Sequence, residues 1–305
     1  MPFPAGEDIM SEKGYMIRSD CIGLDMGGYT IDVTPRRTLA YAAAVGALEE
    51  VYFDDARPGG IVAPPPFIVS VEWPVMLSPQ YIAGIGLSDD TLFNNLVHAF
   101  QDSFFHRVIR PGDRLQVRGC IAQVRKTSAG AVVVCRITTR DAVSGDPVAE
   151  GWFGSLFRGV AIDGEPGTAV EPPSLRREAG LEGPGIKRVT IQIPRGLPHV
   201  YSECAHIWNP IHTERKFALK KHLPDIILHG TCTWAQACLA VIRAYAGGMP
   251  TRLRRFGGRF SRMVIPGSHI VVEHRADPAE QGVVHFAVRN EAGELAVTNG
   301  VAEIA

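Results

Sequence analysis

The 305-residue sequence has no run of about 20 apolar residues, no closely spaced cysteine pair and almost no net charge. Without a long apolar run, we expect no membrane-spanning helix and no membrane partner. The formal net charge of −1 gives no general attraction to polyanions, so nucleic-acid binding is not expected. Hydrophobic residues make up 46% of the chain and charged residues 21%, an ordinary globular composition. The length suits one large domain or two smaller ones.

The six cysteines stand too far apart to suggest a metal site or a disulfide framework. They occupy positions 21, 120, 135, 204, 232 and 238, and none forms a C-x-x-C pair. The N-terminal stretch MPFPAGEDIMSEKGY contains acidic residues and lacks the apolar core of a signal peptide. We therefore expect a cytoplasmic protein with free cysteines and no metal.

The chain resembles itself at a spacing of about half its length. FHRVIRPGDRLQV at residues 105–117 matches FSRMVIPGSHIVV at residues 260–272, a constant offset of 155 (260 − 105 = 155). A repeat of this spacing indicates two copies of one domain. In each copy Pro-Gly marks a turn that precedes a strand. Valine-rich runs broken at residues 144–146 and 290–293 then predict hairpins, so each copy should contain an antiparallel sheet.

One long buried helix is predicted in the second copy, over about residues 229–247. Trp234, Cys238 and Ile242 recur at helical spacing, and few polar residues interrupt the segment. A helix that is apolar almost all round must be buried. The first copy has only a weaker counterpart, PPFIVSVEWPVM, which Pro74 cuts. We therefore predict an α+β fold, a double hotdog in which two antiparallel sheets each wrap a central helix.

A stretch rich in proline, glycine and charge, DGEPGTAVEPPSLRREAGLEGPG, joins the two copies. Such a composition is typical of a linker. The predicted domains are an N-terminal hotdog at residues 1–162, a linker at 163–185 and a C-terminal hotdog at 186–305.

Two short strings near the start of the predicted helix carry the candidate chemistry. Asn-Pro-Ile-His occupies residues 209–212, and Leu-His-Gly occupies residues 228–230. Together with the repeat and the buried helix, they resemble the MaoC-like family of (R)-specific enoyl-CoA hydratases and dehydratases. The resemblance implies a lyase that hydrates an enoyl-CoA or dehydrates a 3-hydroxyacyl-CoA. It implies no cofactor beyond the CoA that the substrate carries, and one active site per chain, with the N-terminal half as a wall of the acyl pocket.

The resemblance also implies a role for each residue of these strings. His212 would be the acid–base catalyst, because a histidine can take up and release protons near neutral pH. Asn209 would help to order the site, and the Gly230 N–H would hold the thioester carbonyl oxygen at the helix start. Each residue also has a plain structural interpretation. His212 could be a surface turn residue, Gly230 a tight entry to the helix, and Asn209 a helix cap.

One position departs from the family pattern, Asp-x-Asn-Pro-x-His. Ile207 stands where the aspartate is usual, and isoleucine cannot accept a proton. The preceding segment also looks one residue longer than the family's, so a local shift could bring His206 into the vacant place. His206 could equally serve packing. The missing carboxylate leaves two alternatives open: an acyl-thioester isomerase that uses His212, or a non-catalytic acyl-CoA-binding subunit.

The basic segment RLRRFGGRFSR at residues 252–262 follows the predicted helix. Arg254, Arg255 and Arg259 could bind the phosphates of CoA at the site entrance, because arginine contacts phosphate through paired donors. The alternative is a solvated charged face. We expect a small-molecule acyl-CoA as the binding partner. Hotdog sheets commonly pair edge to edge, so the two halves could pair with each other, or two chains could form a homodimer.

Overall fold

A computed structural model describes residues 15–88, 96–175, 181 and 185–305. Residues 1–14, whose composition argued against a signal peptide, lie outside the described residues, as do parts of the predicted linker. Within the described ranges, no helix is long and apolar enough to cross a membrane.

The first half begins with short pieces and continues as helices followed by four long strands. Its elements are β1 (Ile17–Arg18), η1 (Ser19–Cys21), β2 (Asp25–Asp32), α1 (Pro35–Val45), α2 (Glu50–Phe53), η2 (Pro65–Phe67), α3 (Ile68–Glu72), η3 (Trp73–Leu77), α4 (Pro79–Gly84), β3 (Leu96–Phe105), β4 (Arg114–Thr127), β5 (Gly130–Asp141) and β6 (Pro147–Arg158). The short strands β7 (Ile162–Asp163) and β8 (Gly167–Thr168) follow.

The second half repeats this order. Its elements are β9 (Lys187–Gln192), α6 (Leu197–Ala205), α7 (Pro210–Thr213), α8 (Arg215–Lys220), α9 (Gly230–Tyr245), η4 (Pro250–Arg252), β10 (Leu253–Phe260), β11 (His269–Ala276), β12 (Val283–Asn290) and β13 (Leu295–Ile304). Both predicted hairpins, β5–β6 and β12–β13, are confirmed.

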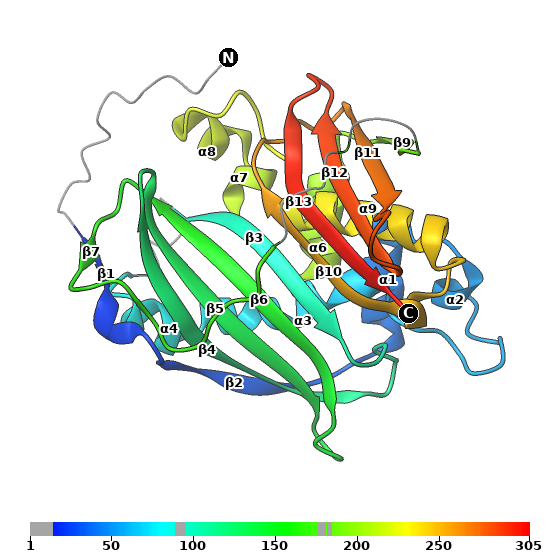
Figure 1. The fold of residues 1–305 in the computed structure, drawn as a ribbon, viewed down its shortest axis with the longest axis horizontal. Helices are drawn as coiled ribbons and strands as arrows, with labels where there is room; N and C mark the ends of the chain where they lie inside the picture. Colours follow the sequence, from blue (N-terminus) through cyan, green and yellow to red (C-terminus); the bar gives the residue numbers. More distant parts are fainter. Residues whose placement is uncertain (1–14, 89–95, 176–180, 182–184) are drawn as a thin grey trace.

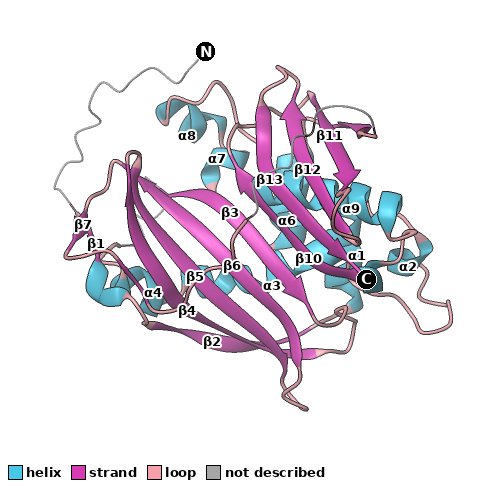
Figure 2. Cartoon of the chain, viewed as in Figure 1, coloured by secondary structure: helices cyan, strands magenta, loops and turns pink. Residues whose placement is uncertain are grey.

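One eleven-stranded sheet runs through both halves in the order β2-β4-β5-β6-β3-β10-β13-β12-β11-β9, with β8 beside β4. The halves meet where β3 pairs antiparallel with β10 and places Gln101 opposite Gly258. Figures 1 and 2 show this sheet as one layer with the helices behind it. The double hotdog is confirmed, and its two sheets are joined edge to edge within a single chain.

The central helix α9 is buried as its apolar periodicity requires. Trp234 is 0% exposed and Leu239 is 1% exposed. The counterpart in the first half is confirmed as short and broken, because Pro74 lies in the 3-10 turn η3 that follows α3. The six cysteines are free thiols, and four of them are buried.

Main-chain hydrogen bonds show that the two halves begin their central helices in the same way. The Ala63 N–H donates to the Ile109 carbonyl at 2.8 Å, and the Leu228 N–H donates to the Val264 carbonyl at 2.8 Å. Ile109 and Val264 are themselves 155 residues apart, the offset of the sequence repeat (264 − 109 = 155). Each half can therefore be compared with the other, residue by residue, around this point.

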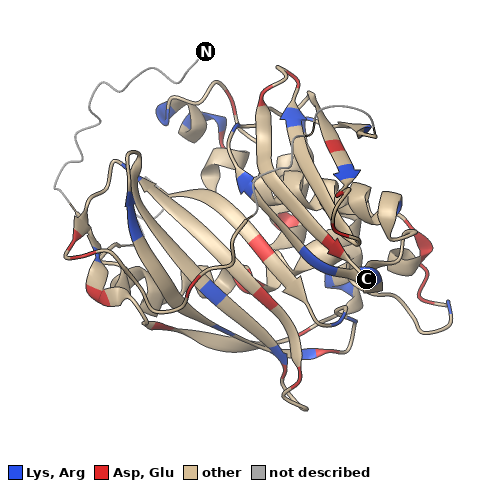
Figure 3. Ribbon diagram, viewed as in Figure 1, with Lys and Arg blue, Asp and Glu red and all other residues tan. Residues whose placement is uncertain are grey.

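The segment after β8 packs on the outer face of the sheet, away from the helices. Val170 and Leu175 contact a small apolar cluster there that includes Phe100 and Trp152. The linker and domain boundaries stay a prediction, but this part of the segment is attached to the sheet. Figure 3 shows acidic and basic residues dispersed over both halves.

Candidate active site

The turn that carries His212 is fixed by its own sequence. Asn209 is the N-cap of α7, and its side-chain oxygen accepts the Ile211 N–H at 3.2 Å. Pro210 follows at the first helical position, where its missing N–H costs nothing. The plain interpretation of Asn209 as a cap therefore holds, and the cap orients His212 three residues later.

The His212 ring is held in one tautomer. Its Nδ1 lies 2.8 Å from the Ile227 carbonyl oxygen. Because a carbonyl can only accept, Nδ1 carries the hydrogen and Nε2 keeps its lone pair. Burial lowers the pKa of His212 to about 4, although the hydrogen bond to Ile227 opposes that effect. The ring is therefore neutral at neutral pH and presents Nε2 as a base.

His229 stacks on this ring with the centroids 3.6 Å apart and the planes at 22°. Its Nε2 lies 3.2 Å from the Ile207 carbonyl and 3.1 Å from the Ser202 hydroxyl. Burial lowers the pKa of His229 well below its usual range, and His212 lowers it further. His229 thus bonds to the backbone and supports His212 through a neutral stack that the sequence alone does not reveal.

Gly230 begins α9, the long buried helix. The first N–H groups of a helix have no partner within it, and no side chain among the described residues caps this helix start. A β-carbon at Gly230 would lie 3.0 Å from the Phe260 ring. Glycine therefore lets the Phe260 ring pack closely against this helix terminus, where the unpaired N–H groups favour negative charge.

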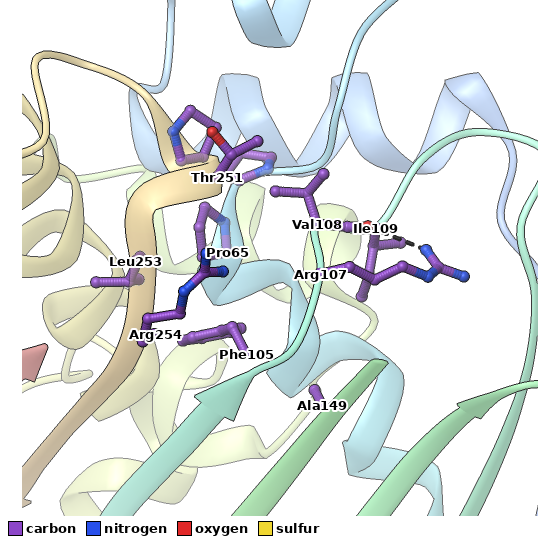
Figure 4. Close-up of a pocket in the computed structure, with 11 residues that line it drawn as sticks. Pro65, Phe105, Arg107, Val108, Ile109, Ala149, Thr251, Leu253 and Arg254 are labelled. Atoms are coloured by element: carbon purple, nitrogen blue, oxygen red, sulfur yellow. Dashed lines mark hydrogen bonds between the residues drawn. The ribbon is translucent and has the colours of Figure 1, made fainter. Parts of the chain in front are cut away.

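The first half lacks these donors. Counting from the matched hydrogen bonds, Pro64 stands where the second half has His229, and Pro65 stands where it has Gly230. Proline has no N–H, so the helix start in the first half cannot bind an oxyanion through its backbone. Figure 4 shows the pocket at this place, where Pro65 lies near Phe105 and Arg254.

The first half also lacks the base. The Val62 N–H donates to the Val51 carbonyl at 3.0 Å, as the Ile227 N–H donates to the Ile211 carbonyl at 3.2 Å. The next residue along is Tyr52 in the first half and His212 in the second. The Tyr52 hydroxyl is buried without a partner among the described residues. Of the two equivalent positions, only the second half combines a histidine with a free helix N–H.

The shift that would bring His206 into the aspartate position does not occur. His206 is the left-handed C-cap of α6, with φ 54°, and its side chain is exposed. Gly46 ends α1 in the same way, with φ 74°. The next residue, Ile207, is 5% exposed and belongs to the hydrophobic core. The structure therefore keeps His206 at the surface and leaves no carboxylate at the position of Ile207.

The arginines of the basic segment separate into different surroundings. Arg255 is 6% exposed and forms two hydrogen bonds with Asp102, at 3.0 and 2.7 Å, and one with Glu303 at 3.1 Å. Its guanidinium joins β3 to β10 and is not available for a CoA phosphate, so the expectation for Arg255 is corrected. Arg254 is exposed beside the proline pocket of the first half, and Arg259 is partly exposed near the end of β10.

One residue near the site gave no signal in the sequence. His98, on β3 of the first half, stacks on Phe153 at 3.7 Å and contacts the Phe260 ring at 4.7 Å. Phe260 in turn covers Gly230. His98 therefore belongs to the surroundings of the helix start, because the β3–β10 pairing brings the halves together. No group of three or more potential metal ligands occurs in the described part of the chain.

Comparison with known proteins gives two domain matches. The MaoC like domain matches residues 199–294, and the dehydratase domain region described as FAS1-like matches residues 20–151. The chain is 31% identical over 140 residues to a fatty acid synthase subunit beta from Aspergillus oryzae, which covers 45% of this chain and 7% of that one. It thus spans a small fraction of that relative's length.

Two further similarities extend over most of the chain. It is 27% identical over 256 residues to the 3-hydroxyacyl-thioester dehydratase Y of Mycobacterium tuberculosis, covering 80% of this chain and 83% of that one. A MaoC-like dehydratase from Phytophthora capsici aligns with a TM-score of 0.79 at 20% identity, over 94% of this chain and 97% of that one. At that identity the structural likeness concerns the fold.

Proposed function

We propose that this chain, which combines a FAS1-like dehydratase region with a MaoC like domain in one double hotdog, is a lyase that hydrates 2-enoyl thioesters and dehydrates 3-hydroxyacyl thioesters. One observation carries the proposal. The neutral His212, with Nε2 free to accept a proton, lies in the half whose central helix starts with an uncapped glycine N–H. The name of the mycobacterial relative supports the same reaction.

In the dehydration direction, Nε2 of His212 takes the proton from C2 of the 3-hydroxyacyl thioester. The electrons of the C2–H bond move toward the thioester carbonyl, where negative charge develops. The C3–O bond then breaks as those electrons form the C2–C3 double bond. The imidazolium returns its proton to the departing hydroxyl, which leaves as water. A single base completes both proton transfers if the C2 proton and the C3 hydroxyl lie on the same face.

The N–H of Gly230 stabilises the developing negative charge by donating a hydrogen bond to the carbonyl oxygen. A donor fixed at a helix N-terminus needs no reorganisation when the charge appears, and one such donor is typically worth about 10²–10³ in rate. The low pKa of His212 makes its imidazolium a strong acid, which suits protonation of a leaving hydroxyl.

The substrate is carried as a CoA thioester, and no further cofactor takes part. With Arg255 committed to Asp102, Arg254 and Arg259 are the remaining candidates for CoA phosphates. Arg254 lies beside the proline pocket of the first half, so Arg259 is the stronger candidate for the catalytic half. We place the reaction in the cytoplasm, because six unpaired cysteines suit a reducing compartment.

The test is the loss of conjugated thioester absorbance when the protein meets crotonyl-CoA and longer 2-enoyl-CoAs. His212→Ala should lower kcat/KM by about 10²–10⁴. His206→Ala is the matched control, because this exposed histidine lies outside the site and its removal should leave the rate near normal. Full activity in His212→Ala would exclude the proposed mechanism.

A second candidate is an isomerase that moves the double bond of an enoyl thioester. The observation in its favour is Ile207, since moving a proton between carbons involves no water molecule that a carboxylate would have to activate. Product analysis by NMR separates the two reactions. A 3-enoyl product formed without a 3-hydroxyacyl product would favour the isomerase.

A further inference from the structure

The loop that carries His212 is longer than its counterpart in the first half. In the first half, the Val62 N–H donates to the Val51 carbonyl and closes a loop of ten residues, 52–61. In the second half, the Ile227 N–H donates to the Ile211 carbonyl and closes a loop of fifteen residues, 212–226. The five additional residues (15 − 10 = 5) accommodate the helix α8, where the first half has only turns after α2.

The two loops also differ in the sign of their charge. The first-half loop contains one arginine and two acidic residues, a net charge of −1 (1 − 2 = −1). The second-half loop contains four basic and two acidic residues, a net charge of +2 (4 − 2 = +2). The four basic residues are Arg215, Lys216, Lys220 and Lys221, and Figure 3 shows α8 with its basic residues in blue. Positive charge therefore accompanies the half that has the histidine base and the free helix N–H.

Two of these cations have no charged partner of their own. Arg215 lies 3.3 Å from Asp225. Lys216 and Lys220 are exposed, and neither forms an ion pair or a hydrogen bond within the described residues. They stand four residues apart on one face of α8, where two like charges destabilise a helix. An anion bound between them would relieve that repulsion.

The helix α8 is tied closely to the catalytic turn. The Glu214 N–H, just before α8, donates to the Pro210 carbonyl at 2.8 Å. After α8 the chain returns to the same place, because the Ile227 carbonyl bonds to Nδ1 of His212 at 2.8 Å. Lys216 follows His212 by four residues, so even an extended chain would keep their Cα atoms within about 14 Å. The unpaired lysines therefore lie beside the site and not elsewhere on the surface.

Arg259, the other candidate cation of the catalytic half, lies on the opposite side of the sheet. It pairs with Phe100, which belongs to the apolar cluster on the outer face. Cross-strand partners share a face, so Arg259 also stands on the outer face. The next residue, Phe260, points to the helix side and covers Gly230. The lysines of α8 are thus the better placed cations for a ligand that reaches Gly230.

We propose that Lys216 and Lys220 bind the phosphate end of the pantetheine arm that carries the acyl thioester. This binding role rests on the proposed function in one respect, because it takes the thioester to lie at His212 and Gly230. CoA and an arm attached to a carrier protein share this phosphate ester. Lysine binds phosphate as a point charge, and charge-assisted bonds to an oxyanion can form at an exposed surface without a cavity.

The binding of saturated thioesters tests this role. Isothermal titration compares hexanoyl-CoA, hexanoyl-4′-phosphopantetheine and hexanoyl-pantetheine, which share one acyl group and differ in phosphate. A saturated acyl group cannot be hydrated, so affinity is measured apart from catalysis. At low ionic strength the wild type should bind both phosphate-bearing ligands at least about tenfold more tightly than hexanoyl-pantetheine, and added salt should reduce the difference.

The variants locate the phosphate. Lys216→Gln combined with Lys220→Gln should abolish the phosphate preference and leave the affinity for hexanoyl-pantetheine unchanged. Glutamine and lysine have similar helix propensities, so α8 should still form. Arg140→Glu is the matched control, because it also lowers the net charge by two, at an exposed position near the β5–β6 turn. Figure 1 shows that turn and α8 at opposite ends of the molecule.

Several outcomes would overturn the role of α8 and leave the lyase intact. They are equal affinity of the wild type for all three thioesters, a phosphate preference that survives in the double variant, and an equal loss in Arg140→Glu. A preference lost in Arg259→Gln but kept in the double variant would assign the phosphate to β10 and overturn it as well.

The remaining outcomes support the role and identify the carrier. A preference that the double variant loses for both phosphate-bearing ligands assigns the phosphate of the arm itself, and a loss for hexanoyl-CoA alone assigns the nucleotide phosphates. Either loss, in a protein that hydrates no enoyl-CoA, would retain the role of α8 and reject the lyase. A wild type that binds none of the three thioesters would reject both.

Discussion

Replacement of Glu72 by glutamine should stabilise the protein, and should do so increasingly as the pH rises. Glu72 is 1% exposed, and burial raises its pKa from 4.5 to about 8. Between these two pH values the unfolded chain has released the proton while the folded chain still holds it. Unfolding therefore releases a proton, and the free energy of unfolding falls as the pH rises.

The magnitude follows from the width of that interval. Each pH unit costs up to about 1.36 kcal/mol, so the whole interval from 4.5 to about 8 amounts to roughly 5 kcal/mol. Below pH 4.5 both states hold the proton, and the stability that the protonated carboxyl contributes is fully present. It is lost progressively up to about pH 8. Glutamine keeps the shape and the hydrogen bond from Gln101 without titrating.

Chemical denaturation of the wild type and Glu72→Gln at a series of pH values from 5 to 9 measures the effect. The difference between the two proteins should grow with pH and reach several kcal/mol by pH 8. Comparison with the variant removes the contributions of all other titrating groups that the two proteins share. Parallel curves for the two proteins would refute the reasoning, since they would mean that Glu72 is ionised in the folded state.

Three shorter predictions concern the site itself. kcat/KM should stay flat from pH 8 down to about 5 and fall near pH 4, because the His212 base is neutral above its pKa of about 4; a fall near pH 6.5 would contradict this. Gly230→Ala should lower kcat/KM at least about tenfold, since the new methyl crowds Phe260 and the oxygen site; an unchanged rate would exclude that oxygen site. Ile207→Asp should cost several kcal/mol in denaturation without gaining activity, because the position is in the core; faster hydration at unchanged stability would show that it faces substrate.

The sequence predicts well those features that depend on neighbours along the chain. The span of α9 follows from the 3.6-residue periodicity of its apolar residues, with Trp234 inside, and the hairpins follow from turn residues between valine-rich runs. The cap that Asn209 provides is local too. Each of these features can be read from a short window because the interacting atoms belong to residues a few positions apart.

Local sequence patterns do not predict contacts between segments that are far apart in the chain. Arg255 resembled its basic neighbours, yet strand alternation and the β3–β10 pairing bury it against Asp102, 153 residues away in sequence. The stack of His212 on His229 depends on a loop that returns to the helix start. The sequence also does not identify His206 as the C-cap of α6. A left-handed residue at a helix end is usually glycine or asparagine and only rarely histidine.

The internal repeat can be predicted from the sequence at its Pro-Gly turns but not at its helix starts. The sequence revealed the repeat at the Pro-Gly turns, but insertions change the offset toward the helices, from 155 residues at the turns to 165 between Pro65 and Gly230 (230 − 65 = 165). Only the matched hydrogen bonds restore the correspondence and place a proline opposite the glycine. One consequence is that Pro65→Gly would restore a helix N–H but no base, since Tyr52 stands opposite His212. Two substitutions, at positions 13 residues apart (65 − 52 = 13), are thus needed before the first half could act as the second does, which explains why the pair of halves contains one candidate site and not two.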